Sequence, residues 1–306
     1  MLPSLLTVVE RVCTLFLMIF VGYLCGKLGA ITKRGAQQIT SILFYIVTPA
    51  LIVSSLQDMI GKVTMGNLLT AGGLAIVCMG ASILISTLFF RKSLNERKRV
   101  LQFAAAYSNC GFMGLPLAQA VLGETGVAYA SMFMVVFNLF VWTHGYMSVS
   151  SIRNFDWKRI VTNPGLIGLI VGLPLFAFSL RIPSLFLFPI SSFASMNTPL
   201  AMIVIGCFIS RVNLKEIFQD ADLYLLSAIR LLLIPLACFF ILLPLGVDKE
   251  VGTCVLILSA APSAANTAMF AAQFHGDTKL ASKSVAFTTL FSMITMPVFL
   301  LLAKLL

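Results

Sequence analysis

The chain has very few charged residues. Only 10% of its 306 residues are Asp, Glu, Lys or Arg, while 59% are hydrophobic. An ordinary soluble domain has about 25% charged residues. A composition this apolar excludes a soluble globular protein and predicts an integral membrane protein, most of whose surface faces lipid.

The sequence also lacks the residue sets that build intramembrane enzymes and metal sites. Its seven cysteines are scattered through apolar segments without a Cys-x-x-Cys pair or a Cys/His cluster, which predicts small buried side chains rather than ligands. It has no His-Glu-x-x-His or Gly-x-Ser-x-Gly motif, the patterns that would indicate a metalloprotease or a serine hydrolase. We therefore expect no enzyme, no catalytic residues, no metal and no cofactor.

Long apolar runs fill the rest of the chain. Because about 20 apolar residues cross a bilayer as a helix, hydropathy predicts an all-α protein with ten transmembrane helices. Their approximate bounds are 5–26, 36–57, 66–90, 100–122, 126–150, 164–180, 188–210, 223–245, 251–273 and 281–304.

The basic residues alternate between the predicted loops. Loops after the odd-numbered helices hold fifteen Lys and Arg residues, and loops after the even-numbered helices hold only three: Lys62, Arg181 and Lys249. The positive-inside rule then places the odd loops in the cytoplasm and both termini on the extracytoplasmic side of a cell (inner) membrane. The net charge of +10 thus reflects topology, and we expect membrane lipid, but no nucleic acid, as a partner.

The two halves of the chain resemble each other in the order of their features. Thr48-Pro49 in the second helix matches Thr198-Pro199 in the seventh. With five helices in each half, residues 1–150 and 151–306 enter the membrane from opposite sides. This pattern predicts two inverted five-helix repeats.

The fourth and ninth helices are interrupted in corresponding places, at Ser108 to Pro116 and at Ala261 to Met269. Gly, Pro and Asn weaken a membrane helix, because lipid cannot satisfy the backbone groups that they free. Paired broken helices of this kind indicate the binding site of a secondary transporter, and a free helix N-terminus suits a carboxylate. The predicted substrate-binding residues are Asn109, Gly111, Gly114, Pro116, Pro262, Ser263, Asn266 and Thr267.

Four further polar residues are candidates for ion coupling or support: Asn138, His144, Arg230 and Asp277. His144 could relay a proton, or donate to a backbone carbonyl near the interface. Arg230 could hold the substrate anion, pair with a carboxylate such as Asp277, or extend to the cytoplasmic interface.

Several motifs resemble the auxin efflux carrier family, whose bacterial members are known as malate or malonate permeases. The residues that carry the resemblance are Asn109-Cys-Gly-Phe-Met-Gly-Leu-Pro-Leu117, Thr48-Pro49, Asn163-Pro-Gly-Leu-Ile-Gly168 and Ala260-Ala-Pro262. The resemblance implies a fold similar to sodium/proton antiporters and bile-acid symporters, in which helices 4 and 9 cross. It also implies a scaffold of helices 1, 2, 6 and 7, often the dimer interface, and an elevator-like transport domain of helices 3–5 and 8–10.

The expected function is therefore secondary active or potential-driven transport of a small organic anion. By resemblance this is a dicarboxylate such as malate or malonate, or an auxin-like carboxylate, near Asn109 and the ninth-helix break. The alternatives are a sodium-coupled organic-anion symporter of the bile-acid type and, more remotely, a channel. Proton or sodium coupling and a homodimer through the scaffold helices both remain open.

Overall fold

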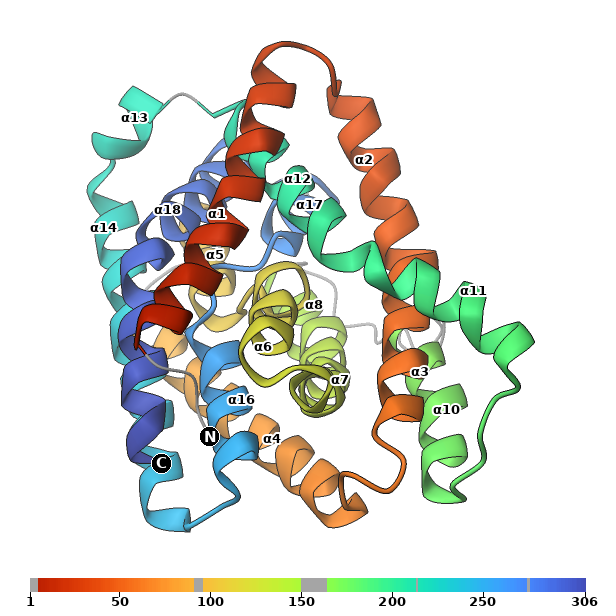
Figure 1. Ribbon diagram of the computed structural model, residues 1–306. Helices are drawn as coiled ribbons and strands as arrows, with labels where there is room; N and C mark the ends of the chain where they lie inside the picture. The colour runs from red at the N-terminus through yellow and green to blue at the C-terminus, as the bar shows by residue number, and fades with distance from the viewer. Residues whose placement is uncertain (1–4, 91–95, 150–163, 213, 274–275) are drawn as a thin grey trace.

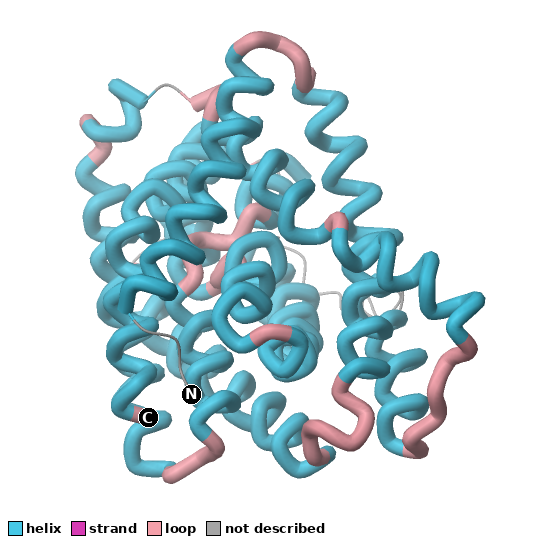
Figure 2. Tube along the Cα trace, viewed as in Figure 1, coloured by secondary structure: helices cyan, strands magenta, loops and turns pink. Residues whose placement is uncertain are grey.

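The computed structural model describes residues 5–90, 96–149, 164–212, 214–273 and 276–306, and these residues form a bundle of helices (Figure 1; Figure 2). The only backbone pairing of the β type in these ranges is one isolated bridge between Ser108 and Ser263. The helices of the first half are α1 (Leu5–Lys27), α2 (Lys33–Ile42), η1 (Leu43–Val47), α3 (Thr48–Asp58), α4 (Met65–Phe89), α5 (Glu96–Ala106), η2 (Cys110–Gly114), α6 (Leu115–Leu122), α7 (Glu124–Phe140), η3 (Val141–Gly145) and α8 (Tyr146–Val149).

The second half continues with helices of similar length. They are α10 (Pro164–Ala177), α11 (Ser184–Ser195), α12 (Asn197–Ile209), α13 (Leu214–Phe218), α14 (Ala221–Ala228), η4 (Ile229–Leu233), α15 (Ile234–Leu242), η5 (Leu243–Leu245), α16 (Lys249–Ala260), α17 (Asn266–Gln273), α18 (Thr278–Leu302) and η6 (Ala303–Leu305). The predicted boundary between the halves, at 150–151, lies outside the described residues.

Each of the ten hydropathy windows contains helix, so the prediction of an all-helical integral membrane protein is confirmed. Within the described residues, six helical runs are long and apolar enough to cross a membrane without interruption. The number of crossings, ten, stays a prediction. The six runs are Lys33–Asp58, Met65–Phe89, Glu124–Ser148, Ser184–Ile209, Ala221–Leu245 and Thr278–Leu305.

Two of the long helical runs and the shorter apolar helix Cys110–Leu122 contain a π-helical turn directly before a proline. The segments η1, η2 and η4 end one residue before Thr48-Pro49, Leu115-Pro116 and Ile234-Pro235. A proline lacks an N–H and its ring clashes with the carbonyl four residues earlier, and a π turn widens the backbone at that point. The helix therefore continues through each proline with a local irregularity rather than ending there.

Two pairs of helices pack closely enough for their backbones to touch. Helix α1 packs against α12, and α3 packs against α10. A Cβ atom added at Gly22 would lie 2.6 Å from the Cα of Ile203, and one at Gly168 would lie 2.8 Å from the Cα of Pro49. Small residues at these positions allow the close approach, so the glycines serve packing within the subunit.

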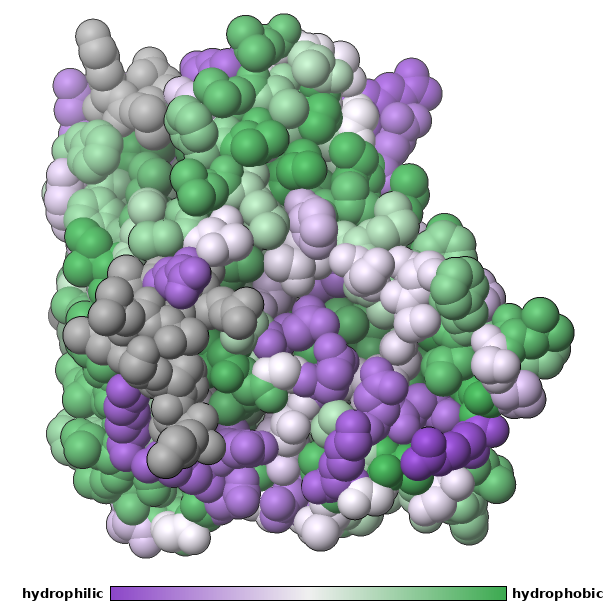
Figure 3. All heavy atoms as spheres, in the orientation of Figure 1, coloured by the Kyte–Doolittle hydropathy of each residue, from purple (hydrophilic) through white to green (hydrophobic). Residues whose placement is uncertain are grey.

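The surface of the bundle is rich in exposed apolar side chains. Leu17 on α1 is 65% exposed, and Leu185 and Phe188 on α11 are 77% and 76% exposed. Figure 3 shows such side chains, in green, over much of the upper part of one face. A soluble monomer rarely exposes so much apolar surface, and hydrocarbon is the solvent that suits it.

Candidate functional site

The two interrupted helices meet at their interruptions. The chain is not helical at residues 107–109, between α5 and η2, or at residues 261–265, between α16 and α17; we call these two segments the crossover. The Asn109 N–H donates to the Pro262 carbonyl at 2.6 Å, and the Ala264 N–H donates to the Tyr107 carbonyl at 2.9 Å. The two segments thus satisfy part of each other's backbone, which lipid could not do.

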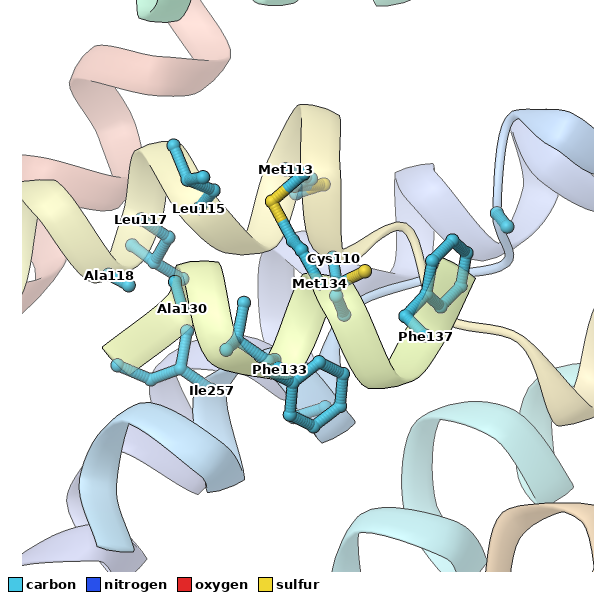
Figure 4. Packing of buried hydrophobic residues seen from close by; sticks show 14 of the residues in the cluster. Cys110, Met113, Leu115, Leu117, Ala118, Ala130, Phe133, Met134, Phe137 and Ile257 are labelled. Atoms are coloured by element: carbon cyan, nitrogen blue, oxygen red, sulfur yellow. The ribbon is translucent and has the colours of Figure 1, made fainter. Parts of the chain in front are cut away.

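A small cavity of about 40 Å³ opens beside the crossover. A space of this size is large enough for a few water molecules or the polar end of a small ligand. In Figure 4, Met134 and Phe137 of α7 lie close to Cys110 at the start of η2. The lining residues come from η1, α3, the crossover, η2, α7 and α17: Phe44, Thr48, Ser108, Asn109, Cys110, Gly111, Phe112, Met134, Phe137, Asn138, Ala264, Ala265 and Asn266.

Polar atoms at the crossover are buried without hydrogen-bond partners. Asn109 is 4% exposed, and its Oδ1 accepts one long bond of 3.4 Å from the Phe112 N–H. Its Nδ2 has no partner, and neither do the hydroxyls of Ser108 and Ser263. Because a buried polar group without a partner costs about 1–3 kcal/mol, these groups are the natural place for a bound ligand or water.

The electrostatics of the cavity favour an anion. The helix formed by η2 and α6 begins at Cys110 beside the cavity, with Asn109 as its N-cap, and α17 begins at Asn266 on the cavity wall. Helix N-termini carry partial positive charge and free N–H groups. None of the residues that line the cavity is acidic, so no side chain in its wall neutralises that charge.

The other residues predicted for the two breaks differ in their surroundings. Gly111 lines the cavity, whereas a Cβ at Gly114 would lie 2.8 Å from Cδ2 of Leu258 on α16. Pro116 is buried at the start of α6. The Ser263 N–H donates to Oγ1 of Thr288 at 3.1 Å.

Of the three predicted residues that remain at the second break, only Asn266 lines the cavity. Pro262 acts through its carbonyl, which accepts from Asn109. The Thr267 hydroxyl is turned back to its own chain and donates to the Ala264 carbonyl at 2.7 Å. Pro262 and Thr267 therefore support the shape of the break rather than face the cavity.

Asn138 and His144 both lie on the α7–η3 run but differ in their relation to the cavity. Asn138 lines it, and its Nδ2 donates to the Met134 carbonyl at 2.8 Å. His144 is linked to the crossover through a neighbour, because its Nδ1 lies 2.9 Å from the Tyr107 hydroxyl. That hydroxyl is also 2.9 Å from the Phe140 carbonyl, to which it donates.

Arg230 is fully buried, with 1% of its surface exposed, so it does not extend to the interface. Its guanidinium donates to the backbone carbonyls of Ala105, Ala106, Ser259 and Ala261. Among the residues that the structure describes, no carboxylate forms an ion pair with it. The pairing with Asp277 that the sequence suggested is therefore absent.

Asp277 lies instead at the start of α18, where its Oδ1 accepts from the Leu280 N–H at 2.8 Å. Its Oδ2 is 4.0 Å from Arg97, which forms closer ion pairs with Asp220 at 2.7 Å and Asp222 at 2.9 Å. The hydrogen bonds that Arg97 donates to Asp220 and then to Asp222 raise the pKa of Arg97. Asp277 belongs to this exposed cluster and does not line the cavity.

Tyr107 and the apolar wall of the cavity are functional candidates that sequence reasoning did not select. Tyr107 directly precedes Ser108, the first residue of the predicted break, and that neighbouring position was the available signal. Phe44 and Thr48 line the cavity from a distant part of the chain. The Thr48-Pro49 motif marked that region but not its contact with the crossover.

The chain is similar along almost its whole length to membrane transporters. A model of the family described as membrane transport protein matches residues 7–300. Two relatives named uncharacterized transporters, from Methanothermobacter thermautotrophicus and Methanocaldococcus jannaschii, are each 25% identical; the alignments cover 94% and 93% of this chain and 96% and 95% of the relatives. A protein of Rhizobium meliloti named "Putative malonate transporter" is also 25% identical, over 92% of this chain and 91% of its own length.

Proposed function

We propose that the chain, which belongs to the membrane transport protein family, carries a small organic anion across the membrane. The family agrees with the resemblance to the auxin efflux carriers. The chain is a multi-pass membrane transporter and not an enzyme. Transport is secondary active or driven by the membrane potential. The observation on which the substrate class rests is Asn109, which lines a cavity where two helices begin and whose buried Nδ2 has no hydrogen-bond partner.

The substrate's carboxylate binds at the crossover under this proposal. Asn109, Ser108 and Asn266 offer uncharged donors on the cavity wall, and the starts of η2 and α17 add positive potential. The apolar side of the cavity, including Phe44, Phe112 and Phe137, faces the carbon part of the substrate. Malonate is the first candidate because a relative carries that name; malate and an auxin-like carboxylate are the next.

The transporter has ten transmembrane helices in two inverted repeats, with the boundary near residue 150. Packing of α1 against α12 and of α3 against α10 supports this, because exchanging the first and second halves exchanges these two pairs. We place both termini on the extracytoplasmic side of the cell membrane, on the strength of the loop charges.

Transport proceeds by an elevator movement of one domain against another. Helices α1, α2, α3, α10, α11 and α12 form the scaffold, and the remaining long helices move with the crossover. The cavity supports this division, since Phe44 and Thr48 belong to the scaffold while Asn109 and Asn266 belong to the moving domain. A homodimer through the scaffold is compatible with the exposed apolar side chains of α11.

The test is flux into proteoliposomes that contain the purified protein. Malonate, malate, succinate and indole-3-acetate are each measured with and without a proton gradient, a sodium gradient or an imposed potential. Saturable, electrogenic or proton-stimulated flux of at least one acid supports the proposal. Flux that requires sodium would favour the bile-acid-symporter type, and flux that never saturates would indicate a channel. Absence of flux for every acid would withdraw the substrate class.

A further inference from the structure

The guanidinium of Arg230 joins the ends of two helices from opposite halves of the chain. Nε donates to the Ala261 carbonyl at 3.0 Å, Nη1 to that of Ala105 at 3.1 Å, and Nη2 to that of Ser259. Ala105 lies in the last turn of α5, and Ser259 and Ala261 lie at the end of α16. One side chain thus satisfies several of the carbonyls at the ends of both interrupted helices.

The charges at this point balance. A helix C-terminus carries roughly −0.5 of an elementary charge, so two such ends present roughly −1 to the guanidinium, which carries +1. Arg is always protonated and presents five donors in a planar fork. With no ion pair to Arg230 among the described residues, the helix ends themselves are its counter-charge.

In carriers with interrupted membrane helices, free carbonyls and half-helix C-termini are the ligands that bind a coupling sodium ion. Here a covalently attached cation already occupies those carbonyls. We propose that Arg230 is a resident cation that replaces a coupling sodium ion at the crossover, so that transport proceeds without sodium. Its role is to position the two helix ends; it does not touch the substrate.

The opposite side of the crossover has no such resident charge. There the starts of η2 and α17 face the cavity, none of whose lining residues is acidic. The substrate anion supplies that charge while it is bound. The inference rests on the proposed function for its transport readout, but its stability readout stands without it.

The first measurement uses the wild-type protein alone. Thermal unfolding of the purified protein is followed in sodium chloride and in choline chloride at equal ionic strength. Flux of any transported acid is compared in the same two salts. We expect the same Tm and the same flux in both. A rise of Tm with sodium that saturates, or loss of flux in choline, would overturn the proposal.

The second measurement replaces the cation. Arg230→Ala leaves the carbonyls of both helix ends buried without a donor, and we expect Tm to fall by about 10 °C. Millimolar guanidinium chloride should restore several degrees in this variant and none in the wild type, because the free ion fits the space of the missing head group. Arg211→Ala is the matched control: Arg211 also donates to a backbone carbonyl, that of Ile31, but is exposed. Its Tm should change little and should not respond to guanidinium.

Arg230→Lys keeps the charge but loses the fork, and we expect an intermediate Tm, which provides the comparison if Arg230→Ala does not fold. The assignment would be overturned if both Arg230→Ala and Arg230→Lys had the same Tm as the wild type and the same response of Tm to sodium. A fall in Tm of Arg230→Ala that neither guanidinium nor sodium restores would also overturn it. If no acid is transported while guanidinium rescue is observed, the proposed substrate class fails and the resident cation stands.

Discussion

The two sides of the crossover carry opposite partial charges. They also differ in whether their polar groups have hydrogen-bond partners: we call the side with partners saturated and the side without them unsaturated. On one side the C-terminal ends of α5 and α16 are held by Arg230, which is 1% exposed and bonded to several carbonyls. On the other side Asn109 lines the cavity, and its buried Nδ2 has no hydrogen-bond partner. The saturated side can keep one structure through a transport cycle, while the unsaturated side gains most when a ligand arrives.

This difference explains how one motif can serve both stability and binding. An interrupted membrane helix exposes positive and negative ends together. Here the protein satisfies the negative ends permanently and leaves the positive ends to an exchangeable partner. Substitutions on the two sides should therefore separate, with Arg230 variants changing chiefly stability and Asn109 variants changing chiefly transport.

The largest effect on transport is expected from Asn109→Ala. Loss of an amide that binds a carboxylate should lower kcat/KM for the transported acid about 10- to 100-fold, which is what a hydrogen bond to a charged group is worth. The Tm should fall by only a few degrees, because Nδ2 has no partner to lose and the N-cap bond that Oδ1 accepts from the Phe112 N–H is long, at 3.4 Å. Flux in proteoliposomes and thermal unfolding test the two parts.

Asn197→Ala is the matched control for Asn109→Ala. Asn197 is also buried, at 3% exposure, with an unpartnered Nδ2, but it does not line the cavity. Transport by this variant should remain near that of the wild type. Equal losses in both variants would mean that any buried amide matters, and Asn109 would no longer mark the substrate site.

Two glycines of the same π-helical segment give the next comparison. Gly114 faces Leu258, and a valine there should lower the stability by about 1–3 kcal/mol through overpacking, since even a Cβ would lie 2.8 Å from the Leu258 Cδ2. A Cβ at Gly111 has only Met134 Cε nearby, at 3.7 Å. Gly111→Ala should therefore keep the wild-type Tm but lower flux, because the methyl group enters the cavity. Reversal of these two results would contradict the geometry of the crossover.

The positions of the two helix breaks were predictable because they depend on local chemistry. Asn109 is a good N-cap, and the first break lies at 107–109, at the start of the predicted stretch from Ser108 to Pro116. Gly111, Gly114 and Pro116 do not end the helix as expected, because they lie in the helical run of η2 and α6 that follows the break. The second break followed from Pro262 and from its matching place in the chain. Hydropathy and composition likewise predicted an all-helical membrane protein.

The partners of Arg230 could not be predicted in the same way. They are backbone carbonyls 125 residues before it and 29 and 31 residues after it, and a carbonyl leaves no mark in the residue type. The residue types instead suggested a carboxylate, Asp277, as the partner, but Asp277 lies at the start of α18 near Arg97. The position of Thr48 and Phe44 on the cavity wall was hidden for a related reason, since it depends on how distant helices pack.

A smaller effect is expected at His144, which touches the crossover only through Tyr107. If His144 couples transport to protons, His144→Gln should keep basal flux within about twofold of the wild type, because Gln still bonds to the hydroxyl. The stimulation by a proton gradient should disappear, because Gln does not titrate. His275→Gln, at the other histidine of the chain, is the control. Unchanged stimulation in His144→Gln would remove His144 from the coupling path.

The smallest effect is expected far from the crossover, at Glu216 on α13. Its carboxylate lies 2.7 Å from Lys279 and 3.0 Å from Lys283 on α18, and hydrogen bonds from Lys279 and then Lys283 lower its pKa to about 2. A lowered pKa stabilises the folded protein above the unfolded-state value of about 4.3, and this contribution is lost as the pH falls through about 2. Glu216→Gln should therefore lower Tm slightly at neutral pH, and the difference should vanish in strong acid and in high salt.

Exposed ion pairs contribute little, whereas removing a buried charge that holds several groups is costly. In one thermal unfolding experiment, Glu216→Gln should therefore give the smallest fall in Tm and Arg230→Ala the largest. A loss of Tm in Glu216→Gln as large as that in Arg230→Ala would show that burial does not set the size of the effect here. The contrast between the saturated side of the crossover and the rest of the molecule would then fail as an explanation of stability.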